Sequence, residues 1–372
     1  VFGQSFAAAR LPLLLLASLL PLITYHCSLL TTGLRRHALA AGLLAIVCGY
    51  YPIYWGTTDS FAVYAVVVSL TFVAVSRGSR VRSNDFSRSG QQTAEAVTTN
   101  DGWQWWLAAG VCAGLAHLTR ADGLLVLVVV LWAVVSYQWS VNKGRWSVFT
   151  VHCSLVIVGY LLVMLPWFIR NLLVVGSPLG AGGAGTLWLI EYNDIFNYPP
   201  NLTPARYFAA EWGVILDGKL QSLISNLQTI LAVQGLIFLV PFILVGLWQL
   251  RKQALYRIVM LYAALLYVAM TFAFSFPGAR GGLLHSGVAL MPFYFPAALV
   301  GLDTAIDWIA SRLKHWKPEL AKRNFTILIV AFAAVFTLAL TIPRLRGLGE
   351  DPAYALLRDL PTEAVVMSNN PP

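Results

Sequence analysis

Ten stretches of mainly apolar residues recur along the chain, each close to the length of about 20 residues that an α-helix needs to cross a bilayer. Backbone polar groups in lipid must be paired within the segment, so these stretches can be helices but not open strands. Of the 372 residues, 58% are hydrophobic and 11% are charged, which excludes an ordinary soluble domain. The sequence predicts an all-α, polytopic transmembrane helical bundle with spans near residues 11–31, 38–54, 61–77, 103–118, 122–139, 147–167, 227–250, 256–275, 285–303 and 325–342.

Basic residues are divided unequally between the two ends of these predicted spans. One end carries 16 of the 25 lysines and arginines and six of the 16 acids, which gives it a net charge of +10 and leaves −1 for the other end. Lysine and arginine concentrate in cytoplasmic loops, so the basic-rich end is predicted to face the cytoplasm and both chain ends to lie on the opposite side. The net charge of +9 therefore follows from topology and requires no nucleic-acid partner.

The two ends of the chain indicate a fragment. An apolar run follows Arg10 and continues to about Leu30 without a small-residue cleavage site, as in a mature helix rather than a signal peptide. The chain starts at Val1 without a methionine and stops at Pro372, soon after a polar segment has begun. We expect truncation at both ends, with a transmembrane domain over 1–345 and the start of a non-cytoplasmic segment over 346–372.

The cysteines give no sign of a disulfide framework or a metal site. All four lie inside predicted spans at irregular intervals, and the six histidines are equally scattered. No metal and no cofactor are expected. The four cysteines are Cys27, Cys48, Cys112 and Cys153.

Two longer segments lie outside the predicted spans. Residues 78–102 are rich in Ser, Thr, Gly and Arg and are predicted to form a disordered cytoplasmic loop. Residues 168–226 mix aromatic and acidic side chains, as expected for a folded external loop on the bilayer surface. Within it, apolar residues recur at helical spacing from Thr203 to about Leu223, which predicts an interfacial amphipathic helix opened by Thr203 and Pro204.

The segment LPWFIRNLLVVGSP, residues 165–178, places a cation at the predicted external end of a span. Arg170 runs against the charge bias of that side, and Asn171 follows it. Snorkelling to headgroups would account for the arginine. Arginine also binds phosphate through two parallel hydrogen bonds, so Arg170 and Asn171 are candidate binding residues for a lipid phosphate.

Two short external loops carry the candidate catalytic carboxylates. Asp59 lies in GTTDSF, and its alternatives are helix capping, a substrate contact or general-base catalysis. Asp122 follows Arg120 in TRADG. One interpretation is a local ion pair or helix cap; the other is that Arg120 binds the donor phosphate while Asp122 orients it.

Two further external segments have side chains suited to binding. Glu191, Tyr192, Asn193 and Asp194 combine acids, an amide and a phenol, which is typical of sugar recognition as well as of a solvated turn. The glycine-rich turn PGARGGLLHSG carries Arg280 and His285, as candidate contacts to phosphate or acceptor. Loop flexibility alone would also explain its glycines.

Taken together, PWFIRN...GSP, GLAHLTRADGLL, LWLIEYNDIFNYPPNLTPAR, FPGARGGLLHSGVALMPF and LPTEAVVMSNNPP resemble bacterial GT-C membrane glycosyltransferases. These belong to the dolichyl-phosphate-mannose protein mannosyltransferase superfamily and are related to aminoarabinose transferases. The resemblance implies a GT-C bundle in the cell membrane. It also implies transfer of a sugar from a polyprenyl-phosphate donor to a glycan, lipid or protein acceptor on the non-cytoplasmic face, by direct displacement with inversion. The main catalytic acid of such families lies in the first external loop, which is expected upstream of Val1.

Two other classes remain open. A secondary transporter or flippase would also have about ten helices, but it usually shows midplane charges and matching interrupted halves. A lipid-linked polysaccharide polymerase or ligase would share a one-sided site, with arginine and histidine concentrated in a large external loop. Here that loop is acidic and aromatic.

Overall fold

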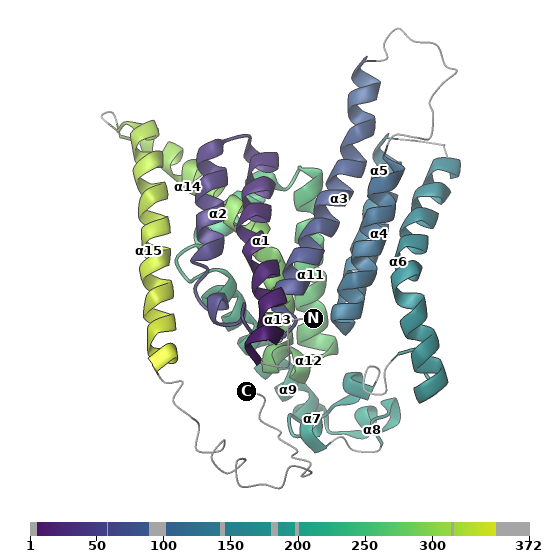
Figure 1. Ribbon diagram of the computed structural model, residues 1–372. Coiled ribbons are helices and arrows are strands. Elements are labelled where there is room, and N and C mark those ends of the chain that lie inside the picture. Colours follow the sequence, from purple (N-terminus) through teal and green to yellow (C-terminus); the bar gives the residue numbers. More distant parts are fainter. Residues whose placement is uncertain are drawn as a thin grey trace.

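The computed structural model describes residues 6–57, 59–88, 102–141, 146–179, 185–197, 201–313 and 316–346, and within them it contains helices and no strands (Figure 1). The prediction of an all-α, polytopic bundle is confirmed. The principal helices are α1 (Phe6–Thr32), α2 (Arg35–Ile46), α3 (Phe61–Arg88), α4 (Trp103–Thr119), α5 (Leu124–Val141), α6 (Trp146–Val175), α10 (Val240–Leu250), α11 (Ala254–Val268), α14 (Met291–Ala310) and α15 (Pro318–Arg346).

Six helical segments among the described residues are long and apolar enough to cross a membrane. The chain is a multi-pass membrane protein. The six segments are Arg10–Thr32, Phe61–Ser79, Phe149–Val175, Ala254–Ala273, Ser275–Ala310 and Pro318–Leu345. The other predicted spans correspond to the shorter helices α2, α4, α5 and α10, which pack among the longer ones.

Two predicted spans are interrupted for identifiable reasons. The span predicted over 38–54 stops at Ile46, and the chain turns through Gly49, whose φ of +69° favours glycine, into a short 3-10 helix that contains Pro52. The span predicted over 227–250 divides into a π-helical turn at Thr229–Gln234 and α10. Between them Leu236 and Ile237 have φ values of 45° and 60°, a left-handed conformation that is unusual for these residues.

Close helix crossings depend on small residues. A Cβ atom at Gly246 of α10 would lie 1.8 Å from the carbonyl oxygen of Ala297 in α14, and one at Gly301 would lie 1.9 Å from that of Phe242. Gly110 of α4 and Gly159 of α6 allow a similar approach. Small residues let helix backbones pack closely within lipid, where burial of apolar surface gives little driving force.

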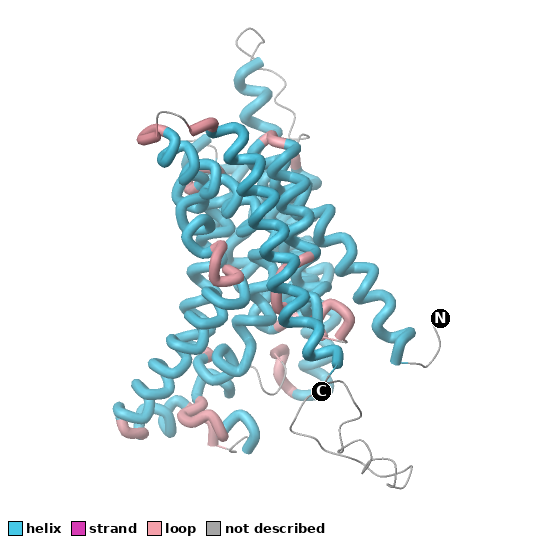
Figure 2. The backbone as a smooth tube through the Cα atoms, turned by 90° about the vertical axis from the view of Figure 1, so that its left-hand side faces the viewer, coloured by secondary structure: helices cyan, strands magenta, loops and turns pink. Residues whose placement is uncertain are grey.

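The elements of the long loop after α6 gather at one end of the bundle. Helices α7 (Asp194–Asn197), α8 (Pro204–Ala209) and α9 (Trp212–Gln228) lie at the lower end in Figure 1, where α1 begins and α15 ends. The view turned by 90° in Figure 2 shows the long helices running side by side between the two ends. The end that carries α7, α8 and α9 is called the loop end below, and the opposite one the basic end.

The amphipathic helix differs in detail from its prediction. Thr203 caps its start, because its Oγ1 accepts a hydrogen bond of 3.3 Å from the backbone N–H of Arg206. The helix is then broken at Ala210, whose ψ of 155° is extended. It resumes at Trp212 as α9, which continues past the predicted end at Leu223 to Gln228. The prediction of a disordered loop over 78–102 is wrong for its first part, since α3 continues to Arg88. A helix propagates readily once nucleated, and this stretch has no proline to stop it. Residues 89–101 and 347–372 lie outside the described residues.

Candidate functional site

Three short loops converge at the loop end of the bundle. The first holds Asp59 and Ser60 before α3, and the second holds Arg120 and Asp122 between α4 and α5. The third element is α13 (Leu283–Gly287), which carries His285 and Ser286. Four residues that the sequence predicts separately are thereby brought into one polar cluster: Asp59, Arg120, Asp122 and His285.

Arg120 lies at the centre of this cluster. Its Nε donates to Asp122 Oδ1 at 3.0 Å and to the Ser286 hydroxyl at 2.9 Å, while Nη1 donates to the Ser60 hydroxyl at 3.2 Å. The Ser286 hydroxyl donates in turn to the second oxygen of Asp122. The side chains of Arg120 and Asp122 are only 18% and 9% exposed. The arginine therefore joins all three loops through partly buried, charge-assisted hydrogen bonds.

Asp59 and His285 form the more accessible half of the cluster. Nδ1 of His285 lies 3.1 Å from Oδ2 of Asp59, and the two side chains are 27% and 41% exposed. Burial by itself would raise the pKa of Asp59, but the His285 contact and hydrogen bonds from the backbone N–H and hydroxyl of Ser60 outweigh it and lower this pKa to about 2. Asp59 is therefore a carboxylate at neutral pH.

Local structure fixes the position of the imidazole. The ring of His285 stacks on Phe61, the first residue of α3, with centroids 4.1 Å apart and planes inclined by 23°. The backbone before α13 turns at Gly281, whose φ of 134° suits glycine alone. A Cβ at that position would lie 3.7 Å from Nε2 of His285, so the missing side chain leaves this edge of the ring open.

The acidic loop segment is held by an internal ion pair. One guanidinium nitrogen of Arg206 donates to both carboxylate oxygens of Asp194 at 3.1 Å, and the backbone N–H groups of Ile190 and Glu191 donate to the same carboxylate. Burial would raise the pKa of Asp194, but Arg206 and these N–H groups lower it below its usual range. Glu191 and Tyr192 remain exposed, and the ring of Tyr192 packs edge-on against Phe196.

The loop contacts the segment that carries His285. Arg280 lies in the π-helical turn Gly278–Gly282, directly before α13. Its guanidinium carbon lies 4.4 Å from the ring centroid of Phe196, a cation–π contact between this turn and the acidic loop. Lys219 of α9 makes a second connection, since its ammonium donates to the carbonyl of Phe272 at 2.6 Å and to the hydroxyl of Ser275 at 2.8 Å. Neither Phe196 nor Lys219 was among the candidate residues.

Arg170 and Asn171 lie within α6, because this helix passes through Pro166 and ends only at Val175, before Gly176 with a φ of +74°. Arg170 is exposed and donates to Asn171 Oδ1 at 3.0 Å, and its guanidinium carbon lies 5.1 Å from the ring centroid of Trp167. Asn171 is 2% exposed and donates weakly to the carbonyl of Pro178 at 3.4 Å.

Sequence reasoning missed the serines and the arginine that complete these contacts. Ser60 and Ser286 stand next to Asp59 and His285, and Arg206 follows Pro204 in the capped helix. Adjacency to a candidate was the available signal, but only the fold shows which loops meet. Among the described residues no group of three histidine, cysteine or acidic side chains is placed to hold a metal ion.

Comparison of the whole chain with solved structures gives its fold. No protein-family model and no curated protein sequence matches it. The oligosaccharyltransferase AglB of Archaeoglobus fulgidus, in complex with an inhibitory peptide and a dolichol-phosphate, aligns with a TM-score of 0.51 at 16% identity, over 99% of this chain and 50% of AglB. The same enzyme tethered to an acceptor peptide with an NVT sequon gives 0.50 at 17% identity, over 90% and 43%.

The fold is of the GT-C type. A crystal structure of ArnT from Cupriavidus metallidurans bound to undecaprenyl phosphate aligns less well, with a TM-score of 0.46 at 18% identity, over 91% of this chain and 58% of ArnT. The chain spans about half the length of the AglB structures. The similarity to AglB establishes the arrangement of helices.

Proposed function

We propose that this chain acts in a membrane glycosyltransferase that moves a sugar from a polyprenyl-phosphate donor to an acceptor on the non-cytoplasmic face. One observation carries the proposal. The imidazole of His285 lies beside the carboxylate of Asp59, next to the hydrogen bonds of Arg120, at the loop end of a GT-C bundle. AglB, which has this type of fold, has a solved structure in complex with an inhibitory peptide and a dolichol-phosphate, which favours a lipid-phosphate donor here.

The reaction requires a base and a means of stabilising the leaving phosphate. The acceptor oxygen attacks the anomeric carbon, the bond from that carbon to the phosphate oxygen breaks, and the sugar is transferred with inversion. The acceptor proton must move to a base, and negative charge develops on the departing polyprenyl phosphate. This displacement changes no oxidation state, so the reaction needs no oxidant or reductant.

His285 is the best-placed proton acceptor. Asp59 faces its Nδ1 at 3.1 Å, which favours a proton on that nitrogen and leaves Nε2 as the basic atom beside the open edge at Gly281. Asp59 itself is a weak base, because its pKa is lowered to about 2. We therefore assign Asp59 to orienting the imidazole and His285 to taking the proton.

The cations divide into two roles. Arg120 is occupied by Asp122, Ser60 and Ser286, so it holds the three loops in register. Arg280 and Arg170 lie outside this network. Arg280 contacts the face of Phe196, and Arg170 is exposed in the last turns of α6. These two guanidiniums are the proposed donors to the lipid phosphate.

The exposed part of the acidic loop supplies the proposed sugar or acceptor contacts. Glu191 and Tyr192 present a carboxylate and a phenol at the surface, while Asp194 is committed to Arg206. Carboxylates accept hydrogen bonds from sugar hydroxyls, and aromatic rings stack on sugar faces.

The test is transfer itself. The protein is reconstituted in vesicles with polyprenyl-phosphate carrying a radiolabelled sugar, and label is followed into lipid, protein and glycan fractions. Label in an acceptor fraction is expected. Label that crosses the membrane still attached to its lipid, with none transferred, would indicate a flippase and overturn the proposal.

A further inference from the structure

A polar cavity lies between α3, α5 and α11 at the basic end, away from the converging loops. It has a volume of about 40 Å³, which exceeds the roughly 10–15 Å³ that one water molecule needs. Ten residues line it: Val75, Ser76, Ser79, Trp132, Ala133, Ser136, Tyr137, Ala254, Arg257 and Ile258.

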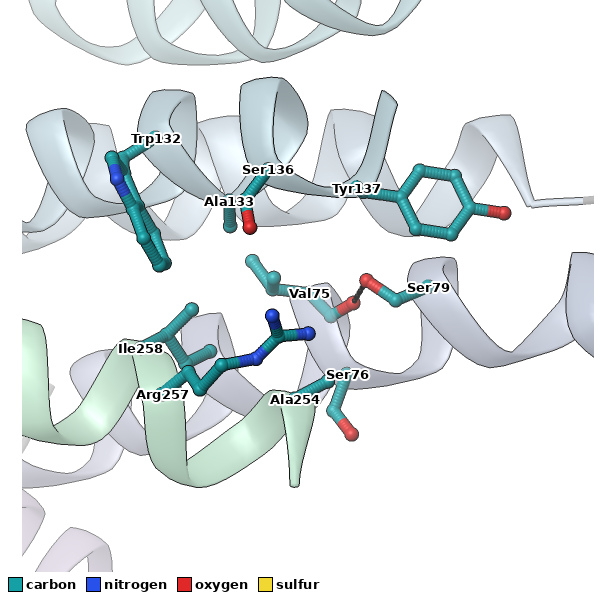
Figure 3. Close-up of a pocket in the computed structure, with 10 residues that line it drawn as sticks. All are labelled: Val75, Ser76, Ser79, Trp132, Ala133, Ser136, Tyr137, Ala254, Arg257 and Ile258. Carbon is teal, nitrogen blue, oxygen red and sulfur yellow. Dashed lines mark hydrogen bonds between the residues drawn. The ribbon is translucent and has the colours of Figure 1, made fainter. Parts of the chain in front are cut away.

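The charge of this cavity is uncompensated. Its ten lining residues include one cation, Arg257, and no acid. Figure 3 shows the Arg257 guanidinium and the Ser136 hydroxyl pointing into the space between the helices. Among the residues whose side chains the structure describes, which do not include Asp85 of α3, no carboxylate forms an ion pair with Arg257.

Serine hydroxyls and a helix start also line the cavity. Ser76 is 3% exposed and lines the cavity, and its hydroxyl makes no hydrogen bond with another described residue. Ala254 begins α11, whose first turn has no side-chain cap, so free backbone N–H groups add partial positive charge beside the cavity.

Apolar walls complete the site. Val75 and Ile258 are buried in the cavity wall, while Trp132 is 39% exposed at its edge. A tryptophan at this level is typical of the membrane interface. Arg257 is exposed near the start of α11, and snorkelling would explain such an arginine, but it does not explain the cavity beside it.

We propose that this cavity binds the phosphate of an anionic phospholipid from the leaflet at the basic end. Arg257 pairs with the phosphate, the serine hydroxyls donate to its oxygens, and the acyl chains run along the apolar wall beside Trp132. Basic pockets between transmembrane helices on the cytoplasmic side suit such headgroups. The proposal is independent of the sugar-transfer reaction at the loop end.

Lipid retention tests the site. The full chain is purified in a non-ionic detergent and incubated with equal amounts of phosphatidylglycerol and phosphatidylcholine, and bound lipid is measured by native mass spectrometry. Phosphatidylglycerol should be retained preferentially. Arg257→Gln should lower its retention roughly tenfold, as expected for loss of one charge-assisted contact.

Two matched variants separate a site from general surface charge. Arg251→Gln removes a cation at the same end whose guanidinium carbon lies 3.9 Å from the Trp248 ring centroid, and it should leave retention unchanged. Ala254→Leu adds bulk at an exposed position of the cavity mouth and should weaken retention without unfolding the chain. Equal retention of the two lipids, or an equal loss in the Arg251 variant, would overturn the proposal. Binding of inorganic phosphate without any preferential retention of phosphatidylglycerol would also overturn the proposal.

Discussion

Nδ1 of His285 lies 3.1 Å from a carboxylate oxygen of Asp59, although one residue precedes α3 and the other sits in α13. This contact joins two loops that the sequence places far apart. Beside it, Arg120 connects both of them to the turn between α4 and α5. The candidate site is thus built from helix ends, which the GT-C bundle brings together.

The Asp59 contact should make stability depend on pH in the acid range. The pKa of Asp59 falls from its ordinary value of 3.8 to about 2 on folding, so its contribution is fully present above pH 3.8 and is lost as the pH falls through about 2. The thermal unfolding midpoint of the wild type in detergent should therefore fall as the pH is lowered through this range. In Asp59→Asn the part of this fall that depends on Asp59 should be absent. If the wild type and the variant have the same profile, the contact does not stabilise the fold.

Arg120 should matter for stability more than for binding. Arg120→Gln leaves Asp122 partly buried without its cation, a change that costs about 3 kcal/mol in comparable sites. Arg170→Gln removes an exposed guanidinium and should change the free energy of unfolding little, while weakening donor binding. Chemical unfolding and donor titration of both variants check the two effects. A stable Arg120→Gln variant would contradict the assigned role.

Helix packing makes a sharp prediction at the crossing of α10 and α14. Gly246→Ala would place a Cβ 1.8 Å from the carbonyl of Ala297, and the forced separation should cost about 1–3 kcal/mol. Gly213→Ala in α9 is the matched control, because nothing lies within 4 Å of its Cβ position. Thermal unfolding should show a lower midpoint for the first variant and an unchanged or slightly higher one for the second. Equal midpoints would mean that the two helices are not in close contact.

The two acids of the external loop should behave differently. Asp194→Asn removes the charge that pairs with Arg206, so the loop should become more sensitive to limited proteolysis. Glu191→Gln leaves this ion pair intact and should raise the KM for donor or acceptor with little change in proteolysis. The reverse pattern would assign sugar contact to Asp194 instead.

Hydrophobic pattern and charge bias together predicted the fold class and the end at which the candidate residues gather. Boundaries failed where single residues override periodicity: Gly49 with Pro52 ends one predicted span, and the π-helical turn before Leu236 divides another. An apolar run does not reveal where a backbone changes its hydrogen-bonding pattern.

The candidate site shows the same limit. Asp59, Arg120, Asp122 and His285 were each identified from residue type and predicted position, but their mutual contacts depend on tertiary packing. The commitment of Asp194 to Arg206 depends on the fold of a loop without a periodic pattern. Neither relationship can be read from spacing.

Sugar transfer by site variants tests whether His285 and Asp59 form the catalytic pair. Polyprenyl-phosphate carrying a radiolabelled sugar is supplied in vesicles to the wild type, His285→Gln, Asp59→Asn and Asp307→Asn. Asp307 is the control, because it is also an exposed carboxylate in an ion pair, with Lys322 at 2.8 Å on α15, at the basic end. We expect transfer by the wild type and by the Asp307 variant. For His285→Gln we expect a loss of roughly 100-fold in kcat, with donor affinity retained. Asp59→Asn should also lower kcat. Full activity in the His285 and Asp59 variants would contradict the assignment of His285 as the proton acceptor.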